Sequence, residues 1–480
     1  MKLYKNVKVH FIGIGGASMS ALAGYLCQKG GAVSGSDREE SMTLDRLKKC
    51  CNVYVGERPQ FVDGVDMVVY SSAVNPRNTE LERAISLGIP TYERRQFLAM
   101  VADDFSRTVA VGGTHGKTTV SAMIIHVLKT LNANFSAHVG GETEYGNFVC
   151  NGNDLFVTEA CEYKCSLLDL NPYMSVVLNA ELDHPDCYEN LQDLYNVFLT
   201  FLSKARVKVF SADFDICKYG HICTKDNEKT LWQDACRYAS KITDKKGEKS
   251  VIVLSNDKVD IWTEEYMGDG KDTHGQHHSQ MVVFKNGHRC METCLYDNSP
   301  NTPFNTLVVI AVLDHFGIGA EEVSKSLLTF KGVKRRNEAV GRLSGARVVF
   351  DYAHHPTQID GMLSTYEGKN LVVFQPHTYS RTRAYFDDFV LSLSKADTLI
   401  VMDTYGAREV EADGIGSEVL AKAVATKSVK TKVYHAKTDN EVVDLVKTLC
   451  CGHDNLLFLG AGDIYSLKGQ LDLDRQTAPI

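Results

Sequence analysis

The stretch VGGTHGKTTV, residues 111–120, carries residue types that bind phosphate. Glycines let the backbone curl around phosphate oxygens, Lys117 adds a positive charge, and the Thr118 hydroxyl can ligate Mg²⁺. The common phosphate-binding pattern requires a glycine where Val111 stands, so this loop is of a different type. Apolar residues recur at helical spacing after Lys117, which predicts a strand, the loop, and a helix whose amino terminus faces the phosphates.

Acidic residues and a histidine follow the next two apolar runs. Glu159 ends one run, and His184 with Asp183 and Asp186 follows another. The ends of strands beside a phosphate-binding loop are where ligands of Mg²⁺ belong. We therefore predict a metal role for Glu159 and His184, although a histidine such as His184, taken alone, is more often structural.

The amino-terminal stretch GIGGASMS resembles a dinucleotide-binding turn. Gly13 and Gly15 stand in place, but Ser18 occupies the third glycine position. The turn either holds a diphosphate on backbone N–H groups or serves only as a tight strand–helix connection. Asp37, near the end of the next strand-like run, either meets a ribose or base or caps the turn.

The last third of the chain gathers arginines and histidines at turns after strand-like runs. Arginine forks suit carboxylates and phosphates, whereas a solvated charged surface is the ordinary alternative. These candidates come from GVKRRNE, DYAHHP and QPHTYSRTR: Arg335, Arg336, Asp351, His354, His355, His377, Arg381 and Arg383.

Length and composition predict a multidomain globular enzyme. A chain of 480 residues suggests about three domains, and no apolar run approaches the roughly 18 residues that cross a bilayer. Fourteen cysteines without a recognisable signal peptide favour reduced thiols in the cytoplasm. The net charge of −8 argues against a nucleic-acid partner.

Strand-like runs alternate with helical periodicity in three successive segments, which predicts an α/β fold with parallel sheets. The regularity weakens between about residues 213 and 298, where SVIVLS and MVVF are short strand candidates in an elaborated edge of the middle domain. The histidines of HGQHH in this segment, with Cys290 and Cys294, either bind zinc or lie in a solvated loop; their spacing fits no closed zinc pattern well.

Taken together, these stretches resemble the Mur ligase family, and its alanine-adding branch most of all. The motifs that carry the resemblance are HFIGIGGASMSALA, GTHGKTT, EACEY, LDHPDCY, FKGVKRR, DYAHHPTQI, QPHTYSRTR and LGAGDI, in the family's order. The resemblance implies a Rossmann-like UDP-sugar domain (1–106), a central P-loop-type ATP-binding domain (107–332) and a Rossmann-like carboxy-terminal domain (333–480).

The chemistry implied by the resemblance is ATP-dependent amide formation. ATP phosphorylates the lactyl carboxylate of UDP-N-acetylmuramate, and the amine of L-alanine attacks the acyl phosphate. Nucleotide contacts are then expected from Asn305, Arg336, Asp351 and the loop residues Gly113, Thr114, His115, Gly116, Lys117, Thr118 and Thr119. Mg²⁺ ligands are expected at Thr118, Glu159 and His184.

The same resemblance assigns the two other substrates. The UDP-sugar is expected at Gly13, Gly15, Gly16, Asp37 and Ser71. Tyr352, His354, Arg381 and Arg383 are expected at the alanine end of the cleft, with Lys117, Glu159, His184, His354 and Arg381 as the catalytic set. The oligomeric state is left open.

The chain departs from the family pattern at three places. Ser18 replaces a glycine, Asn337 replaces an aromatic residue, and SPNTPFN keeps only Asn305 of the usual asparagine-containing run. Two alternatives therefore stay open beside the alanine ligase. One is a ligase of the same family that attaches a ready-made peptide in wall recycling, and the other is a weakened paralogue that binds the UDP-sugar and regulates.

Overall fold

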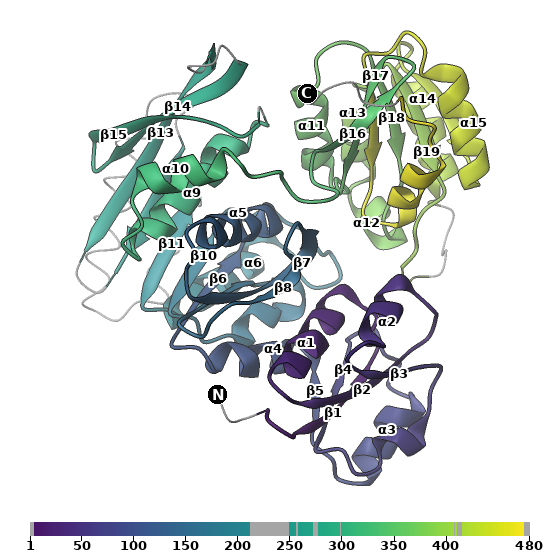
Figure 1. The fold of residues 1–480 in the computed structure, drawn as a ribbon. Helices are drawn as coiled ribbons and strands as arrows, with labels where there is room; N and C mark the ends of the chain where they lie inside the picture. Colours follow the sequence, from purple (N-terminus) through teal and green to yellow (C-terminus); the bar gives the residue numbers. More distant parts are fainter. Residues whose placement is uncertain are drawn as a thin grey trace. The chain divides into compact units, whose positions relative to one another are not determined.

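The computed structural model describes residues 4–211, 249–255, 258–271, 277–297, 299–407, 409 and 415–474. These residues divide into two compact units. The first unit comprises residues 1–182, 190–297 and 302–331, and the second comprises 183–189, 298–301 and 332–480. Figure 1 shows the elements of both units. The domain boundaries expected from the sequence stay a prediction, whereas the three α/β sheets are observed.

The first sheet belongs to the amino-terminal part of the first unit. It has five parallel strands in the order β3-β2-β1-β4-β5. Their bounds are β1 Lys8–Ile12, β2 Ala32–Asp37, β3 Asn52–Val55, β4 Met67–Tyr70 and β5 Thr91–Glu93. The helices are α1 Ala17–Gln28, α2 Met42–Leu47, α3 Thr79–Ser86 and α4 Arg94–Asp103, with a 3-10 turn, η1 Pro59–Val62.

Helix α1 forms for the reason the sequence suggested. Met19, Leu22, Ala23 and Leu26 fall on one face, and all four are buried. The first strand and helix are joined by the Gly13–Gly16 turn, where Gly13 has a positive φ of 81° that favours glycine. This arrangement places the predicted diphosphate turn at the carboxyl edge of the parallel sheet, where α/β folds bind ligands.

The second sheet has ten strands in the order β15-β14-β13-β12-β11-β10-β6-β9-β7-β8. Its parallel part comprises β6 Arg107–Gly112, β7 Phe135–Thr143, β9 Leu155–Glu159, β10 Met174–Val177 and β11 Val207–Ser211, with β8 Gly146–Cys150 antiparallel at one edge. Its helices are α5 Lys117–Thr130, α6 Leu191–Lys204, α9 Thr302–Asp314 and α10 Ala320–Leu327, with the 3-10 segment η2 Tyr163–Asp169.

The opposite edge of this sheet is an antiparallel extension of four strands: β12 Ser250–Leu254, β13 Val259–Lys271, β14 His277–Lys285 and β15 His288–Cys294. The strand candidates SVIVLS and MVVF lie in β12 and β14. This part of the chain is more regular than its sequence suggested, since β13 continues to Lys271 and β14 begins at His277. Cross-strand pairing overrides a weak local strand signal. The side chains of the HGQHH histidines lie outside the described residues.

The third sheet lies in the second unit and has the order β16-β17-β21-β18-β19-β20. The strands are β16 Glu338–Leu343, β17 Ala346–Asp351, β18 Asn370–Phe374, β19 Thr398–Met402, β20 Lys432–Ala436 and β21 Asn455–Leu459, all parallel except β16. The other elements are α11 Pro356–Thr365, α12 Tyr379–Ala384, α13 Phe386–Leu393, α14 Ser417–Lys427, α15 Asp439–Leu449 and η4 Asp463–Gln470. Two apolar clusters pack on the sheet's strands.

Candidate nucleotide and substrate site

The phosphate-binding loop joins β6 to α5, as predicted. Gly113 and Gly116 have φ values of 127° and 86°, conformations that disfavour any residue with a Cβ. A Cβ on Gly113 would also stand 3.0 Å from the Leu178 backbone nitrogen. The loop therefore requires both glycines, and α5 begins at Lys117 with its first N–H groups directed out of the helix end.

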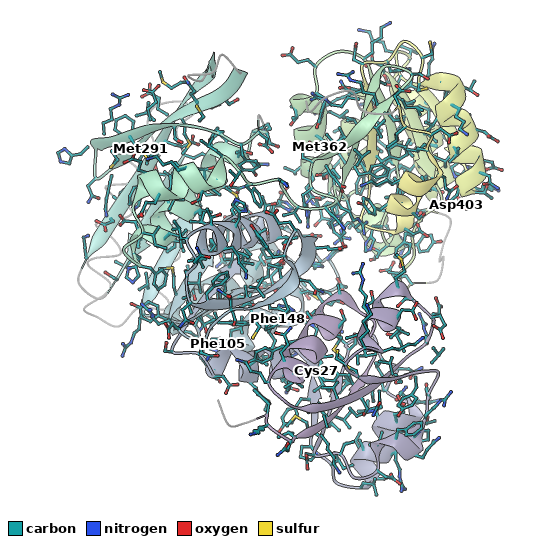
Figure 2. All side chains as sticks on the ribbon, in the orientation of Figure 1. Cys27, Phe105, Phe148, Met291, Met362 and Asp403 are labelled. Carbon is teal, nitrogen blue, oxygen red and sulfur yellow. The ribbon has the colours of Figure 1, made fainter. Side chains whose placement is uncertain are left out.

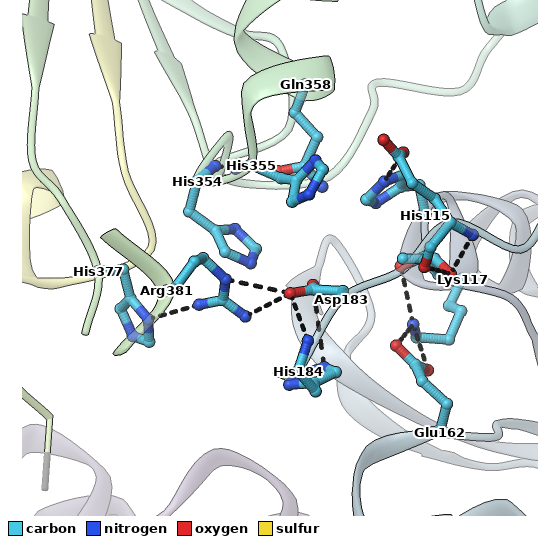
Figure 3. A network of polar contacts seen from close by, with 12 residues as sticks. His115, Lys117, Glu162, Asp183, His184, His354, His355, Gln358, His377 and Arg381 are labelled. Atoms are coloured by element: carbon cyan, nitrogen blue, oxygen red, sulfur yellow. Dashed lines mark hydrogen bonds and ion pairs between the residues drawn. The ribbon is translucent and has the colours of Figure 1, made fainter. Parts of the chain in front are cut away.

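Lys117 is held by a carboxylate that sequence reasoning did not assign. Its Nζ donates to Glu162 Oε2 at 2.8 Å and Oε1 at 3.0 Å, and to the carbonyl oxygens of Gly113 and Thr114 (Figure 3). Burial alone would lower the pKa of Lys117, but the charge of Glu162 outweighs it and raises the pKa above the ordinary value. Lys117 therefore stays a cation in place at the loop.

The segment that follows β10 fixes the loop from its other side. His115 N donates to Asn179 Oδ1 at 2.8 Å, and the His115 ring pairs with Glu181 Oε2 at 2.7 Å. Thr114 exchanges hydrogen bonds with the backbone of Glu181, donating to its oxygen and accepting from its nitrogen. Asn179 and Glu181 escaped prediction because their role depends on the parallel pairing of β10 with β6.

Glu159 and Asn305 lie beside this loop in the first unit. Glu159 ends β9 opposite Val111 of β6, and its Oε1 accepts a hydrogen bond from Gly140 N at 2.8 Å. Its charge also acts to raise the pKa of Lys117. Asn305 is buried in the first turn of α9, and its Oδ1 lies 3.6 Å from the position of a Cβ on Gly116.

The residues predicted to bind the UDP-sugar gather at the carboxyl edge of the first sheet. Asp37 ends β2 and accepts a hydrogen bond from Gly15 N at 2.8 Å, which is the capping role weighed from the sequence. Ser71 follows β4, and its Cβ lies 3.2 Å from the position of a Cβ on Gly13. Gly16 caps α1 in an extended conformation. The role of these residues in binding the sugar stays a prediction.

Ser18, which departs from the family's glycine, connects two domains of the first unit. Its Oγ contacts His138 Nε2 of β7 at 2.8 Å, and Arg94 Nη1 donates to the same oxygen at 3.3 Å. Burial lowers the pKa of His138 to about 3, so the ring is neutral at pH 7. The Tyr25 ring of α1 also stacks on Phe148 of β8, with centroids 4.7 Å apart. The serine therefore contributes to packing between the domains.

Arg381 forms a buried ion pair in the second unit. Its Nε and Nη2 donate to Asp183 Oδ1 at 3.1 and 2.9 Å, and its Nη1 lies 3.2 Å from His377 Nδ1 (Figure 3). Burial alone would raise the pKa of Asp183, but the Arg381 charge holds it well below the usual range. Burial and Arg381 lower the pKa of His377 to about 4. His377 is therefore a neutral acceptor for the guanidinium at pH 7.

Arg383, assigned the same role as Arg381 from the sequence, lies in a different environment. It is exposed on α12, whereas Arg381 on the same helix is buried. The helix has 3.6 residues per turn, so two positions along place the second arginine on another face. Between the two, the structure leaves Arg383 the more accessible to a ligand.

His354 of the DYAHHP stretch lies near Arg381 in the same unit. His354 Nδ1 lies 2.8 Å from the Tyr352 carbonyl oxygen, and the His354 ring packs edge to face on His377 at 5.8 Å. Burial and the Arg381 charge lower the pKa of His354 well below its ordinary value. His184 has a left-handed backbone with φ 59°, and its N–H donates to Asp183. His184 and Glu159 belong to different units, so a shared metal site stays a prediction.

Asp351, the last residue of β17, forms hydrogen bonds that fix the loop before β16 and the turn after β17. Asp351 accepts hydrogen bonds from the backbone of Asn337 and Ala353, both at 2.7 Å, and burial raises its pKa despite the nearby Arg336. The Arg336 guanidinium lies 4.5 Å from the centre of the Tyr352 ring. Asp351 therefore bonds protein backbone here, and its contact with the nucleotide stays a prediction.

Two departures from the family pattern meet in the second unit. Asn337 Nδ2 donates to Ser299 Oγ at 3.3 Å, and the Tyr366 hydroxyl donates to Asn337 Oδ1 at 2.5 Å. Ser299 belongs to the altered SPNTPFN stretch. The asparagine in the aromatic position is therefore satisfied by the serine of that stretch, which makes the two changes mutually compatible.

A glycine-rich phosphate loop on a parallel sheet, with a Rossmann-like domain before it and another after it, defines a multidomain nucleotide-dependent enzyme. Three family models match in that order: the Mur ligase family catalytic domain over residues 8–106, the Mur ligase middle domain over 111–266, and the Mur ligase glutamate ligase domain over 335–462. The chain belongs to the Mur ligase family, whose members use ATP.

Relatives in that family match nearly the whole chain. The UDP-N-acetylmuramate–L-alanine ligase of Clostridium novyi is 35% identical over 98% of both chains, and that of Clostridium beijerinckii is 34% identical over 96% of both. The solved UDP-N-acetylmuramate–alanine ligase of Thermotoga maritima has a TM-score of 0.74 at 25% identity, covering 97% of this chain and 98% of that one. A murein peptide ligase from Psychrobacter arcticus shares the fold, with a TM-score of 0.64 at 18% identity. Among the described residues, no helix is long and apolar enough to span a membrane.

Proposed function

We propose that this chain joins L-alanine to the lactyl carboxylate of UDP-N-acetylmuramate at the expense of ATP. The observation that carries the proposal is the similarity to alanine ligases across all three domains, at 34–35% identity over almost the full length. The product is a precursor of peptidoglycan, and the place of reaction is the cytoplasm, where both substrates and ATP are found together.

ATP supplies the phosphoryl group that activates the carboxylate of the sugar nucleotide. The carboxylate oxygen forms a bond to the γ-phosphorus as the bond to ADP breaks; the alanine nitrogen then bonds to the carbonyl carbon, and phosphate leaves. Lys117 holds the β- and γ-phosphates, and phosphoryl transfer depends mainly on such positioning and charge neutralisation. Glu162 keeps the lysine at the loop, where a phosphate can join it.

The donor chemistry beside the loop fits Mg²⁺. A threonine hydroxyl and a carboxylate are hard oxygen ligands; Thr118 lies in the first turn of α5, and Glu159 ends β9 opposite Val111 of β6. His184 is the further ligand proposed from the resemblance. Mg²⁺ when bound neutralises charge on the transferring phosphoryl group.

The second unit contributes the residues proposed for alanine. Arg383 is the natural partner of the amino acid's carboxylate, and Arg381 organises the site through Asp183 and His377. His354 is neutral at pH 7, so its ring offers the alanine amine a hydrogen-bond acceptor without adding a positive charge. The UDP-sugar is proposed to bind at the Gly13–Gly16 turn.

A substrate panel tests the proposal. Phosphate release is measured with ATP, Mg²⁺ and UDP-N-acetylmuramate, adding each amino acid in turn and then the L-Ala-γ-D-Glu-diaminopimelate tripeptide. We expect L-alanine to be preferred, with glycine and serine poorer, because one small group changes pocket affinity by about 1–3 kcal/mol. Clear preference for the tripeptide would assign the chain to peptide recycling. Binding of the UDP-sugar without any turnover would identify a regulatory paralogue.

A further inference from the structure

Three cysteines from separate stretches meet in the amino-terminal domain. Cys27 lies in the last turn of α1, and Cys50 and Cys51 lie in the connection from α2 to β3. The Cys27 and Cys51 sulfur atoms are 3.2 Å apart, and those of Cys50 and Cys51 are 3.6 Å apart. All three sulfurs lie within 4.8 Å of one another. Figure 2 labels Cys27 on the helix.

These separations suit three sulfurs on one metal ion. Zn²⁺ binds thiolates at about 2.3 Å, which places sulfur pairs around a tetrahedral ion roughly 3.8 Å apart. The distances of 3.2 and 3.6 Å lie slightly below that value, so small side-chain rotations suffice. Thiolates are soft ligands that select Zn²⁺ and Cu⁺ over Mg²⁺. The group is therefore distinct in chemistry from the oxygen ligands proposed beside the phosphate loop.

We propose that Cys27, Cys50 and Cys51 form a binding site for a thiophilic cation of the Zn²⁺ or Cu⁺ class. Three sulfurs complete a trigonal Cu⁺ site, and a water molecule completes a tetrahedral Zn²⁺ site. Cys50 is exposed and Cys27 is partly exposed, which gives the ion a path from solvent. Cys51 is buried, so its sulfur is fixed by packing at the base of the site.

The site stands apart from the predicted substrate residues. Cys27 lies ten positions into α1, about 15 Å along the helix from its amino terminus at the Gly13–Gly16 turn. Cys51 precedes Asn52, the first residue of β3, and so lies at the amino edge of the sheet rather than its carboxyl edge. A bound ion would link the end of α1 to the α2–β3 connection and stabilise this domain without contacting substrate.

A second cysteine pair in the chain provides a matched comparison. Cys450 and Cys451 are also adjacent, directly after α15. Cys450 is buried in an apolar cluster, where its sulfur lies 3.8 Å from the Lys447 carbonyl oxygen. Within the described part of the chain, the only group of cysteine ligand atoms this close is the one at Cys27, Cys50 and Cys51. Adjacency alone therefore does not make a site.

The test is metal titration of the reduced, metal-free full-length protein under anaerobic conditions. Zn²⁺ and Cu⁺ are added in separate titrations, and Co²⁺ serves as a visible probe of thiolate coordination. We expect one ion per chain, protection of three thiols from a thiol-reactive dye, and a rise in the melting temperature. Cys27→Ser and Cys50→Ser should each weaken binding by about tenfold or more, and Cys451→Ser should leave it unchanged.

Because Cys51 is buried, its substitution could disturb folding. The test therefore relies on Cys27 and Cys50, which are more exposed. The melting temperatures of the metal-free variants check that each variant is folded. Failure of both Zn²⁺ and Cu⁺ to bind overturns the proposal. Binding that survives in the Cys27→Ser/Cys50→Ser double variant, or that is lost in Cys451→Ser, overturns it equally. ATP-dependent phosphate release should persist in every variant, so the result is independent of the proposed ligase function.

Discussion

Lys117 with Glu162 and Arg381 with Asp183 are two cation–carboxylate pairs, one in each compact unit, and they differ in how firmly the cation is held: the Lys117 side chain is 15% exposed and that of Arg381 is 6% exposed. The lysine is a compact point charge, paired with a carboxylate and two carbonyl oxygens in the glycine loop that begins α5. The arginine is a planar fork whose three nitrogens are all engaged, by Asp183 and His377.

The two sets of contacts indicate which of the two cations, Lys117 or Arg381, is available to a ligand. A phosphate can join Glu162 at Lys117, because a flexible lysine needs only a short movement to exchange a loop carbonyl oxygen for a phosphate oxygen. Displacing Asp183 from Arg381 would leave a buried carboxylate without compensation, which costs several kcal/mol. We therefore assign Lys117 to the substrate and Arg381 to the organisation of its site.

The largest effect should follow Lys117→Ala. Turnover should fall by about a thousandfold or more, since a positioned cation on a transferring phosphoryl group is worth that much. Binding of the UDP-sugar, measured by calorimetry without ATP, should stay intact because its proposed residues lie on another sheet. Measurable activity near the wild-type rate would remove Lys117 from the phosphate site.

Arg381→Ala should destabilise the protein, whereas Arg383→Ala should not. Loss of Arg381 leaves Asp183 buried and charged, at a cost of about 3–5 kcal/mol in the free energy of unfolding. Arg383 is exposed, so its removal should raise the KM for alanine with little change in stability. Denaturant unfolding and amino-acid kinetics on both variants check this. Equal stability of the two variants would contradict the distinction drawn between them.

Arg381 and Arg383 show which features of the site could be predicted from the sequence and which could not. Local sequence pattern was enough to predict the glycine loop with Lys117 and the position of Glu159 at a strand end. The partners Glu162 and Asp183 were quoted in motifs or noted as neighbours but not assigned to these cations, since pairing depends on tertiary contacts. Burial separates Arg381 from Arg383, and no residue pattern over two positions of a short helix shows it.

Strands on the edges show the same limit. The strands before the phosphate loop, Glu159 and Asp183 are apolar runs that the sequence indicated, whereas the edge strands β16 and β20 were not indicated and the β13–β14 hairpin was underestimated. Edge strands carry polar residues on an exposed face, so their signal is weak until a neighbour pairs with them.

The pH dependence of stability should distinguish His377 from an ordinary histidine. Its folded pKa of about 4 lies below the unfolded value near 6.5, so the unfolded chain binds more protons between those values. Its contribution is complete above about pH 6.5 and is lost as the pH falls to about 4 and below, by about 3 kcal/mol. His377→Asn keeps an acceptor for Arg381 and should flatten the slope of unfolding free energy over this range. An unchanged slope would show that the ring does not titrate as inferred.

The smallest effect is expected for His184→Ala. If His184 is one of several ligands, its removal should raise the Mg²⁺ concentration needed for half-maximal turnover by about tenfold, with turnover at saturating Mg²⁺ largely recovered. Glu159→Gln is the comparison, because its carboxylate is a harder ligand and its loss should not be recovered. An unchanged Mg²⁺ requirement in His184→Ala would give His184 a structural role only.

The central claim is that phosphoryl transfer at Lys117 precedes the joining of alanine. Positional isotope exchange tests it directly, with ¹⁸O-labelled ATP, Mg²⁺ and UDP-N-acetylmuramate but no alanine. The wild-type chain and Arg383→Ala should scramble label between the bridging and non-bridging oxygens of ATP, and Lys117→Ala should not. Absence of exchange in a wild-type enzyme that is fully active with alanine would contradict this order of events.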